Sequence, residues 1–221
     1  MASLFIAALE KHHIQVTAIM TLGPGPTFWD FCSGPKTIGI VPPAPRAARV
    51  DALKRTSNLA KLANVPLYGQ TVDTIRDVAN HCKANGQSFL METGLESPIT
   101  VLRTIKEAAT GNIYVNLDKA NLIFHGKGEP VGALDVPGAY LLRLHAKNRV
   151  YPTDAQKLSR EVAIGQGRVN FPTVIQALKK FSYTGPITIE REIFGPRQEA
   201  DIRQSKLFLE QLISKSYKKE A

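Results

Sequence analysis

Four short apolar runs between residues 88 and 190 are each followed by an acidic residue or a histidine. The four residues are Glu92, Asp118, His145 and Glu190. If the runs are parallel strands, these side chains lie at the carboxyl ends, where α/β sheets and barrels bind their ligands. Carboxylates combined with one imidazole suit a divalent ion. Mn²⁺ or Mg²⁺ is favoured, with Co²⁺ or Zn²⁺ as alternatives.

A metal ion at this position could hold two adjacent sugar oxygens and stabilise an enediolate. Each residue alone has a plainer interpretation. A glutamate after a strand is commonly a solvated turn residue, and a single histidine commonly completes a core. The repetition of the pattern at successive strand ends is harder to explain in that way. We therefore predict a metal site.

The elements that must position these residues alternate from about residue 70 onward between strand-length apolar runs and helical patterns. Strands are expected over 88–91, 113–117, 140–144 and 187–189, and helices over 71–84, 98–109, 171–181 and 201–214. We expect mostly loop over 147–167. Before residue 70 we expect helices over 2–11 and 46–62, a strand over 15–20 and a loop over 23–45. This alternation predicts βαβ units, a parallel sheet and the α/β class.

Four motifs around the strand ends also carry a family resemblance. They are Met91-Glu92-Thr93-Gly94, Asn116-Leu117-Asp118-Lys119-Ala120-Asn121-Leu122-Ile123, His145-Ala146-Lys147 and Thr188-Ile189-Glu190-Arg191-Glu192. In combination they resemble the sugar phosphate isomerase/epimerase family, the xylose isomerase-like TIM-barrel group that also contains endonuclease IV. The resemblance covers about residues 14 to 213. It implies a TIM-barrel-like (β/α) fold and one divalent metal bound by the four strand-end residues. It also implies that Glu92 and Glu190 form the acid/base pair.

Two carboxylates beside a bound metal suit epimerisation or aldose–ketose isomerisation. These reactions remove a proton next to a carbonyl and return it, often on the opposite face. Coordination to the cation should keep Glu92 and Glu190 ionised near neutral pH, and the neighbouring Arg191 should help. We therefore predict Glu92 and Glu190 as the catalytic residues.

Residues near the strand ends are predicted to bind the substrate. Asn116 and Asp118 are two residues apart in a strand, so Asn116 should face the same side. Asn121 and Lys147 follow Asp118 and His145 closely, and Lys147 could meet a phosphate or a hydroxyl. Arg191 completes the predicted substrate-binding set.

The chain is predicted to be a single domain over residues 1–221 with an incomplete barrel. A full barrel has eight strands, whereas we place about five here. The chain opens in what resembles the second barrel helix, so the N-terminal strands are expected to be missing. An internal strand is also expected to be missing near residues 64–68, where two helices almost meet. Either the protein is a fragment, or a partner completes the sheet, or the remaining strands close it differently. Open sheet edges invite pairing with another chain, so we expect self-association, with a homo-oligomer as one form of it, or poor solubility.

Some residues depart from the family pattern around the ligands. Arg143 shares a strand face with His145 by alternation, where relatives tend to carry a small residue. A guanidinium there would lie below the metal and compete with it, unless an acid such as Glu192 pairs with it.

The charge balance favours anionic partners without choosing among them. Lys and Arg number 28 and Asp and Glu 19 among 221 residues, a net charge of +9. An abasic-site endonuclease would suit that charge, but its metal cluster uses several more histidines, and only His145 stands at a strand end. We do not expect a nucleic-acid partner.

The favoured function is a metal-dependent sugar or sugar-phosphate isomerase/epimerase. The alternative is a non-catalytic truncated homologue that binds a ligand or partner.

The remaining composition indicates an ordinary globular chain. No run approaches the roughly 18 apolar residues of a transmembrane helix, so no membrane partner is expected. The first residues lack the basic stretch of a signal peptide. Cys32 and Cys82 do not make a disulfide framework. We therefore expect a cytoplasmic protein.

Overall fold

A computed structural model describes residues 2–21, 23–25, 39–40, 42–62, 67–68, 72–94, 96–125, 132–135, 138–154 and 157–217. The chain divides into two compact units. The first runs from Met1 to Glu92 and includes Arg103–Tyr114, and the second comprises Thr93–Leu102 and Val115–Ala221. Helix α4 (Pro98–Ala108) and strand β3 (Ile113–Asp118) contribute residues to both units.

The first unit contains α1 (Ala2–Lys11), α2 (Pro43–Leu62), β1 (Leu67–Tyr68), α3 (Val72–Ala84) and β2 (Phe89–Glu92). Helix α3 buries one face at helical spacing, formed by Ile75, Val78, Ala79 and Cys82. The turn after it uses Gly86 with a φ of 73°, a conformation that favours glycine. β1 and β2 pair in parallel. The amide of Asn112 donates hydrogen bonds to the carbonyls of Ala79 and Gln87, which ties α3 to the start of β2.

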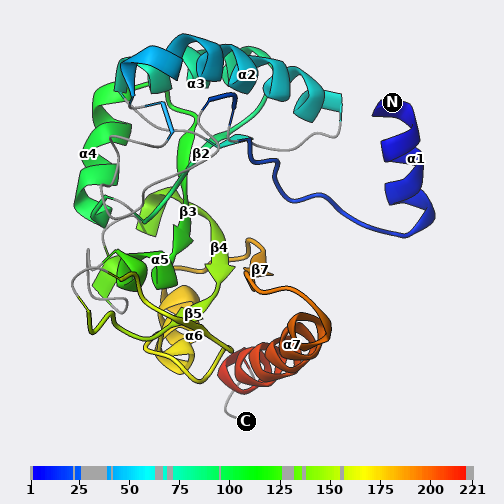
Figure 1. The fold of residues 1–221 in the computed structure, drawn as a ribbon, viewed down its shortest axis with the longest axis vertical. Coiled ribbons are helices and arrows are strands. Elements are labelled where there is room, and N and C mark those ends of the chain that lie inside the picture. Colours follow the sequence, from blue (N-terminus) through cyan, green and yellow to red (C-terminus); the bar gives the residue numbers. More distant parts are fainter. Residues whose placement is uncertain are drawn as a thin grey trace. The chain divides into compact units, whose positions relative to one another are not determined.

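The second unit contains α5 (Lys119–Phe124), β4 (Leu141–Ala146), β5 (Asn148–Arg149), β6 (Glu161–Val162), α6 (Phe171–Lys180), β7 (Ile187–Ile189) and α7 (Pro196–Tyr217). Short 3-10 turns lie at Gly132–Leu134 and Gly138–Tyr140. The side chain of Asn170 caps α6, and the buried face of α6 includes Phe171, Val174 and Leu178. Helices α6 and α7 pack side by side (Figure 1). None of the helices in the described ranges has the length and apolar character that a membrane crossing needs.

Parallel strand pairing places the predicted ligands next to one another. The strand order is β1-β2-β3-β4-β7. Along β3 and β4, Asp118 lies opposite His145, and along β4 and β7, His145 lies opposite Thr188, which is followed two residues later by Glu190. The α/β class is confirmed. Among the described strands the sheet is open, because its order ends at β1 and β7.

Two expectations about the first 70 residues need correction. Within the described residues, the expected strand over 15–20 forms only an isolated bridge at Ile19, and Met20 is exposed. The strand expected to be missing near residues 64–68 is present as β1, which pairs with β2 through Leu67 and Phe89. A strand of two residues is too short to show periodicity. The expected loop over 23–45 lies largely outside the described residues.

The polar segment 147–167 is mostly loop, as expected, but it also contains a short hairpin that was not expected. It contains β5 and β6, which pair as an antiparallel hairpin through Asn148–Val162 and Arg149–Glu161. The Asn148 side chain stabilises it by accepting hydrogen bonds from the backbone N–H groups of Arg149 and Val169. Polar ladders of this kind lack the apolar alternation by which strands are recognised in a sequence.

Tyr183 anchors the turn between α6 and β7 to the start of β4. Its hydroxyl donates to the carbonyl of Pro186 at 2.8 Å and lies 3.4 Å from that of Leu142. Burial raises the pKa of Tyr183 to about 12, although the charge of Arg143 acts in the opposite direction. The phenolate is therefore disfavoured in the folded chain.

The raised pKa of Tyr183 predicts a loss of stability at alkaline pH. An unfolded tyrosine titrates near pH 10, so the stabilising contribution is complete below about pH 10 and is lost as pH rises toward 12. Urea unfolding midpoints at pH 8, 10 and 11 should fall less steeply for Tyr183→Phe than for the wild type. The exposed Tyr217→Phe is the matched control and should follow the wild type. Equal pH slopes in the wild type and Tyr183→Phe would contradict this account.

Candidate metal centre

Asp118 is the last residue of β3 and the N-cap of α5. It is fully buried, and its Oδ1 accepts a hydrogen bond of 2.9 Å from the backbone N–H of Asn121. An aspartate in this position satisfies one of the free N–H groups at the start of a helix. The strand-to-helix transition in Asn116-Leu117-Asp118-Lys119 thus fixes the carboxylate in one orientation.

Thr93 holds the end of β3 from the neighbouring segment. Its hydroxyl donates to the carbonyl of Asp118 at 2.9 Å and accepts from the backbone N–H of Asp118 at 2.9 Å. The backbone N–H of Thr93 donates to the carbonyl of Asn116. The next residue is Gly94. A Cβ atom at this position would lie 3.3 Å from the Cβ atom of Asn121, so glycine allows the two segments to pack closely. The Thr-Gly pair therefore positions Asp118, a role that the sequence pattern alone did not reveal.

His145 and Glu190 face each other across β4 and β7. The Nδ1 atom of His145 lies 2.9 Å from Oε2 of Glu190, and Lys147 Nζ lies 3.0 Å from Oε1. The backbone N–H of Glu190 donates to the carbonyl of Ala146, so the parallel register extends to this residue. Burial alone would raise the pKa of Glu190, but the hydrogen bond with His145 and the charge of Lys147 lower it to about 2. Glu190 is therefore ionised at neutral pH.

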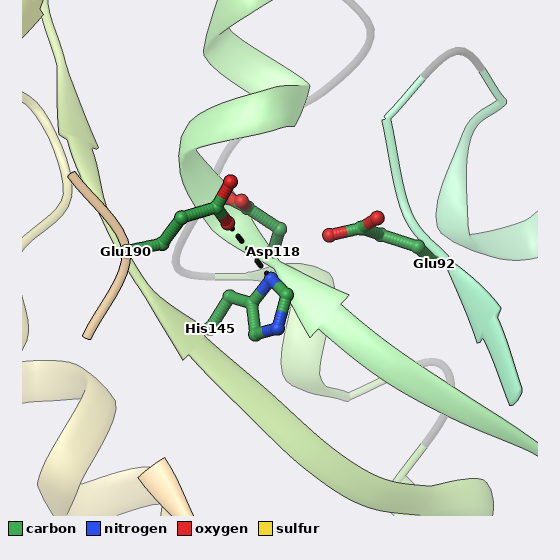
Figure 2. A group of neighbouring side chains, drawn as sticks. All are labelled: Glu92, Asp118, His145 and Glu190. Carbon is green, nitrogen blue, oxygen red and sulfur yellow. Dashed lines mark ion pairs between the residues drawn. The ribbon is translucent and has the colours of Figure 1, made fainter. Parts of the chain in front are cut away.

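Asp118, His145 and Glu190 form a compact set of potential metal ligands. One ligand atom of each lies within 4.8 Å of those of the other two. Glu92 is the last residue of β2 and directly precedes Thr93. Figure 2 shows the side chains of Asp118, His145 and Glu190. The donor chemistry, carboxylate oxygens with one imidazole nitrogen, fits a divalent ion of the Mg²⁺ to Zn²⁺ range.

The four predicted substrate-binding residues lie in different surroundings. Asn116 is fully buried in β3, and Asn121 lies half-buried in α5, with its N–H held by Asp118. Lys147 is only 2% exposed and contacts Glu190 and Glu192. Arg191 is paired with Glu161 and Asp201, at 2.8 and 2.9 Å. A substrate contact by any of the four stays a prediction.

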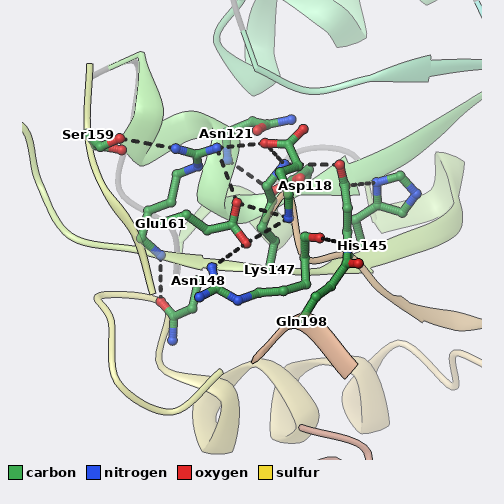
Figure 3. A network of polar contacts seen from close by, with 12 residues as sticks. Asp118, Asn121, His145, Lys147, Asn148, Ser159, Glu161 and Gln198 are labelled. Atoms are coloured by element: carbon green, nitrogen blue, oxygen red, sulfur yellow. Dashed lines mark hydrogen bonds and ion pairs between the residues drawn. The ribbon is translucent and has the colours of Figure 1, made fainter. Parts of the chain in front are cut away.

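A network of alternating charges lies behind His145 and Glu190 and was not predicted. Its members are Lys147, Arg149, Glu161, Arg191, Glu192 and Asp201. Figure 3 shows part of it around Lys147 and Glu161, with Gln198 of α7 at its edge. Burial would lower the pKa of Lys147, but the negative charges of Asp118, Glu190 and Glu192 outweigh burial and raise it. The only signal in the sequence is the density of charged residues beside the motifs.

Arg143 contacts the start of its own strand. Its Nη1 donates to the carbonyl of Leu142 at 3.2 Å, and its charge acts on Tyr183. Glu192, predicted as one acid that could offset the charge of Arg143, contacts Lys147 and Arg149. Competition between Arg143 and a bound metal stays a prediction.

Comparison with known proteins places this geometry in a family. The family model described as xylose isomerase-like TIM barrel matches residues 2–212. A solved xylose isomerase domain protein from Planctomyces limnophilus has 29% sequence identity and a TM-score of 0.90, covering 97% of this chain and 83% of its own. No curated protein gives a significant match.

Two further solved structures share the fold at lower identity. A xylose isomerase-like TIM barrel protein from Mycobacterium smegmatis, in complex with magnesium, has 16% identity and a TM-score of 0.72 over 96% of this chain and 78% of its own. D-Psicose 3-epimerase from Clostridium cellulolyticum, solved with D-tagatose, has 16% identity and a TM-score of 0.70 over 96% of this chain and 83% of its own. With the family model matching nearly its whole length, the chain belongs to the xylose isomerase-like TIM barrel family.

Proposed function

We propose that the chain is a divalent-metal-dependent isomerase or epimerase of sugars or sugar phosphates. The observation that carries this proposal is the cluster of Asp118, His145 and Glu190 at the carboxyl ends of β3, β4 and β7. Ligands of parallel α/β folds bind at this end of the strands. A cytoplasmic location and self-association are part of the same proposal.

Glu92, Asp118, His145 and Glu190 would hold the metal. Glu190 is suited to this role because its low pKa keeps it in the ionised form that binds a cation. Asp118 is suited because its other carboxylate oxygen already caps α5 and fixes the side chain. A bound divalent ion would polarise a substrate carbonyl and make the neighbouring C–H more acidic. We favour Mn²⁺, with Mg²⁺ supported by the magnesium complex of the Mycobacterium smegmatis protein.

Glu92 and Glu190 would move the proton on the carbon next to the carbonyl. One carboxylate removes it and the other returns it, which changes the configuration or shifts the carbonyl. The contact of Lys147 with Oε1 of Glu190 orients the carboxylate. The likeness to D-psicose 3-epimerase, solved with D-tagatose, makes free ketoses the first substrates to test.

Asn116 and Asn121 are the proposed contacts for substrate hydroxyls, because both belong to the strand-to-helix segment that carries Asp118. Lys147 and Arg191 are already paired with carboxylates. We therefore propose that they support the site through those carboxylates.

One observation favours a second candidate, a homologue that binds a ligand without catalysis. Glu190 already has His145 and Lys147 as partners at 2.9 and 3.0 Å, which would compete with a metal for its oxygens. The two functions differ in metal binding and in proton exchange, and the two experiments below separate them.

Asp118→Asn should weaken Mn²⁺ binding without unfolding the chain. Asparagine caps a helix about as well as aspartate does, so the start of α5 should be kept while a negative ligand is lost. Calorimetric titration of the wild type should show one site. Mutation of a residue that only supports a metal ligand typically lowers metal affinity by about 10–100-fold. Asp118→Asn removes a proposed ligand itself, so its affinity for Mn²⁺ should fall by at least that much. The exposed Asp154→Asn is the matched control. Equal affinity of wild type and Asp118→Asn would rule out Asp118 as a ligand.

If proton transfer occurs, deuterium from D₂O should enter the ketose at the carbon next to the carbonyl. Glu92→Gln and Glu190→Gln should each lose turnover by about 10²–10⁴-fold. Glutamine still offers a carbonyl oxygen to a cation, so retained metal with lost exchange assigns the loss to proton transfer. Glu199→Gln, on the exposed face of α7, should exchange like the wild type. Metal binding with no exchange on any ketose or ketose phosphate would favour the non-catalytic candidate.

A further inference from the structure

Glu192 lies two residues beyond Glu190 and joins two buried cations. Its Oε2 atom accepts hydrogen bonds of 2.8 Å from Lys147 Nζ and 2.8 Å from Arg149 Nη2. The Lys147 and Arg149 side chains are 2% and 6% exposed, whereas that of Glu192 is 53% exposed. Glu192 is therefore a partly exposed carboxylate that neutralises two buried cations.

Both cations connect to the proposed metal ligands. Lys147 donates its other contact to Oε1 of Glu190, whose Oε2 faces His145. Arg149 lies over the ring of Phe124, 4.0 Å from its centroid, at the end of α5. Asp118 caps the other end of this short helix. Glu192 therefore contacts both Lys147, which contacts Glu190, and Arg149, which contacts the helix that Asp118 caps.

The position of Glu192 is itself fixed by the β5–β6 hairpin. Its backbone N–H donates to the carboxylate of Glu161 at 3.1 Å. Glu161 also holds Arg191 at 2.8 Å, and Arg149 donates to the carbonyl of Ser159. The backbone at Glu192 is therefore fixed by Glu161, and this places the Glu192 carboxylate beside Lys147 and Arg149.

We propose that Glu192 is a positioning residue that makes Glu190 available to a divalent cation. This inference rests on the proposed metal-dependent function. A buried ammonium requires a compensating charge, and Lys147 divides its contacts between Glu190 and Glu192. Without Glu192, Lys147 would depend more strongly on Glu190, and the positive charge of Lys147 and Arg149 would oppose a cation in the same cluster.

The test is a set of Mn²⁺ titrations by calorimetry. Glu192→Gln should raise the Kd about 10–100-fold, the usual effect of losing a residue that supports a metal ligand. The double variant Glu192→Gln/Lys147→Met should recover most of that loss, because it also removes the cation that Glu192 neutralises. Recovery of this kind is a coupling between the two sites, which general damage to the fold would not produce.

Three controls keep the outcome clear. Glu199→Gln removes the same charge from an exposed pair on α7 and should bind like the wild type. Glu192→Asp keeps the charge and should retain more affinity than Glu192→Gln. Thermal melts of the metal-free variants establish that each is folded.

The results separate this inference from the proposed function. An unchanged Kd in Glu192→Gln, or a loss that the double variant does not recover, would overturn the role of Glu192 while leaving the metal site intact. A wild type that binds no Mn²⁺ would overturn the metal site and this inference together. Metal binding without turnover would overturn only the proposed isomerase or epimerase activity.

Discussion

The parallel register of β4 with β3 and β7 is the constraint on which the candidate site depends. It places Asp118 beside His145, and His145 beside the strand that ends at Glu190. Because side chains alternate between the faces of a strand, a slip of one residue would turn His145 to the opposite face. The buried Leu144 and Ala146 flank His145 and fix the face on which it lies.

Carboxylates that lie close together at one end of a sheet repel one another. In the second unit this repulsion is offset by lysine and arginine side chains that alternate with the carboxylates. Lys147 and Arg149 lie two and four residues after His145, and Arg191 directly follows Glu190, so cations follow both β4 and β7 along the chain. Their carboxylate partners come from the β5–β6 hairpin, from α7 and from Glu192. Within this arrangement, the hydrogen bond with His145 and the charge of Lys147 depress the pKa of Glu190. Glu190 is therefore held in the ionised form that can bind a cation.

The sequence predicted the parts of this molecule that rest on local periodicity. The helices over 71–84 and 171–181 and the strand over 187–189 agree with α3, α6 and β7 within about two residues. The positions of Asp118, His145 and Glu190 at strand ends were predictable for the same reason. The β5–β6 hairpin was missed because polar strands carry no apolar alternation. The pairing of Glu192 with Lys147 and Arg149 spans more than 40 residues of chain, and nothing local encodes it.

We propose that a single divalent ion binds among Glu92, Asp118, His145 and Glu190. Crystals of the wild-type protein grown with MnCl₂ test this proposal, with anomalous diffraction data collected on both sides of the manganese absorption edge. We expect one anomalous peak within coordination distance of these four side chains, with Lys147 still in contact with Glu192. Well-ordered side chains at this cluster with no peak among them, or a peak held by other residues, would contradict it.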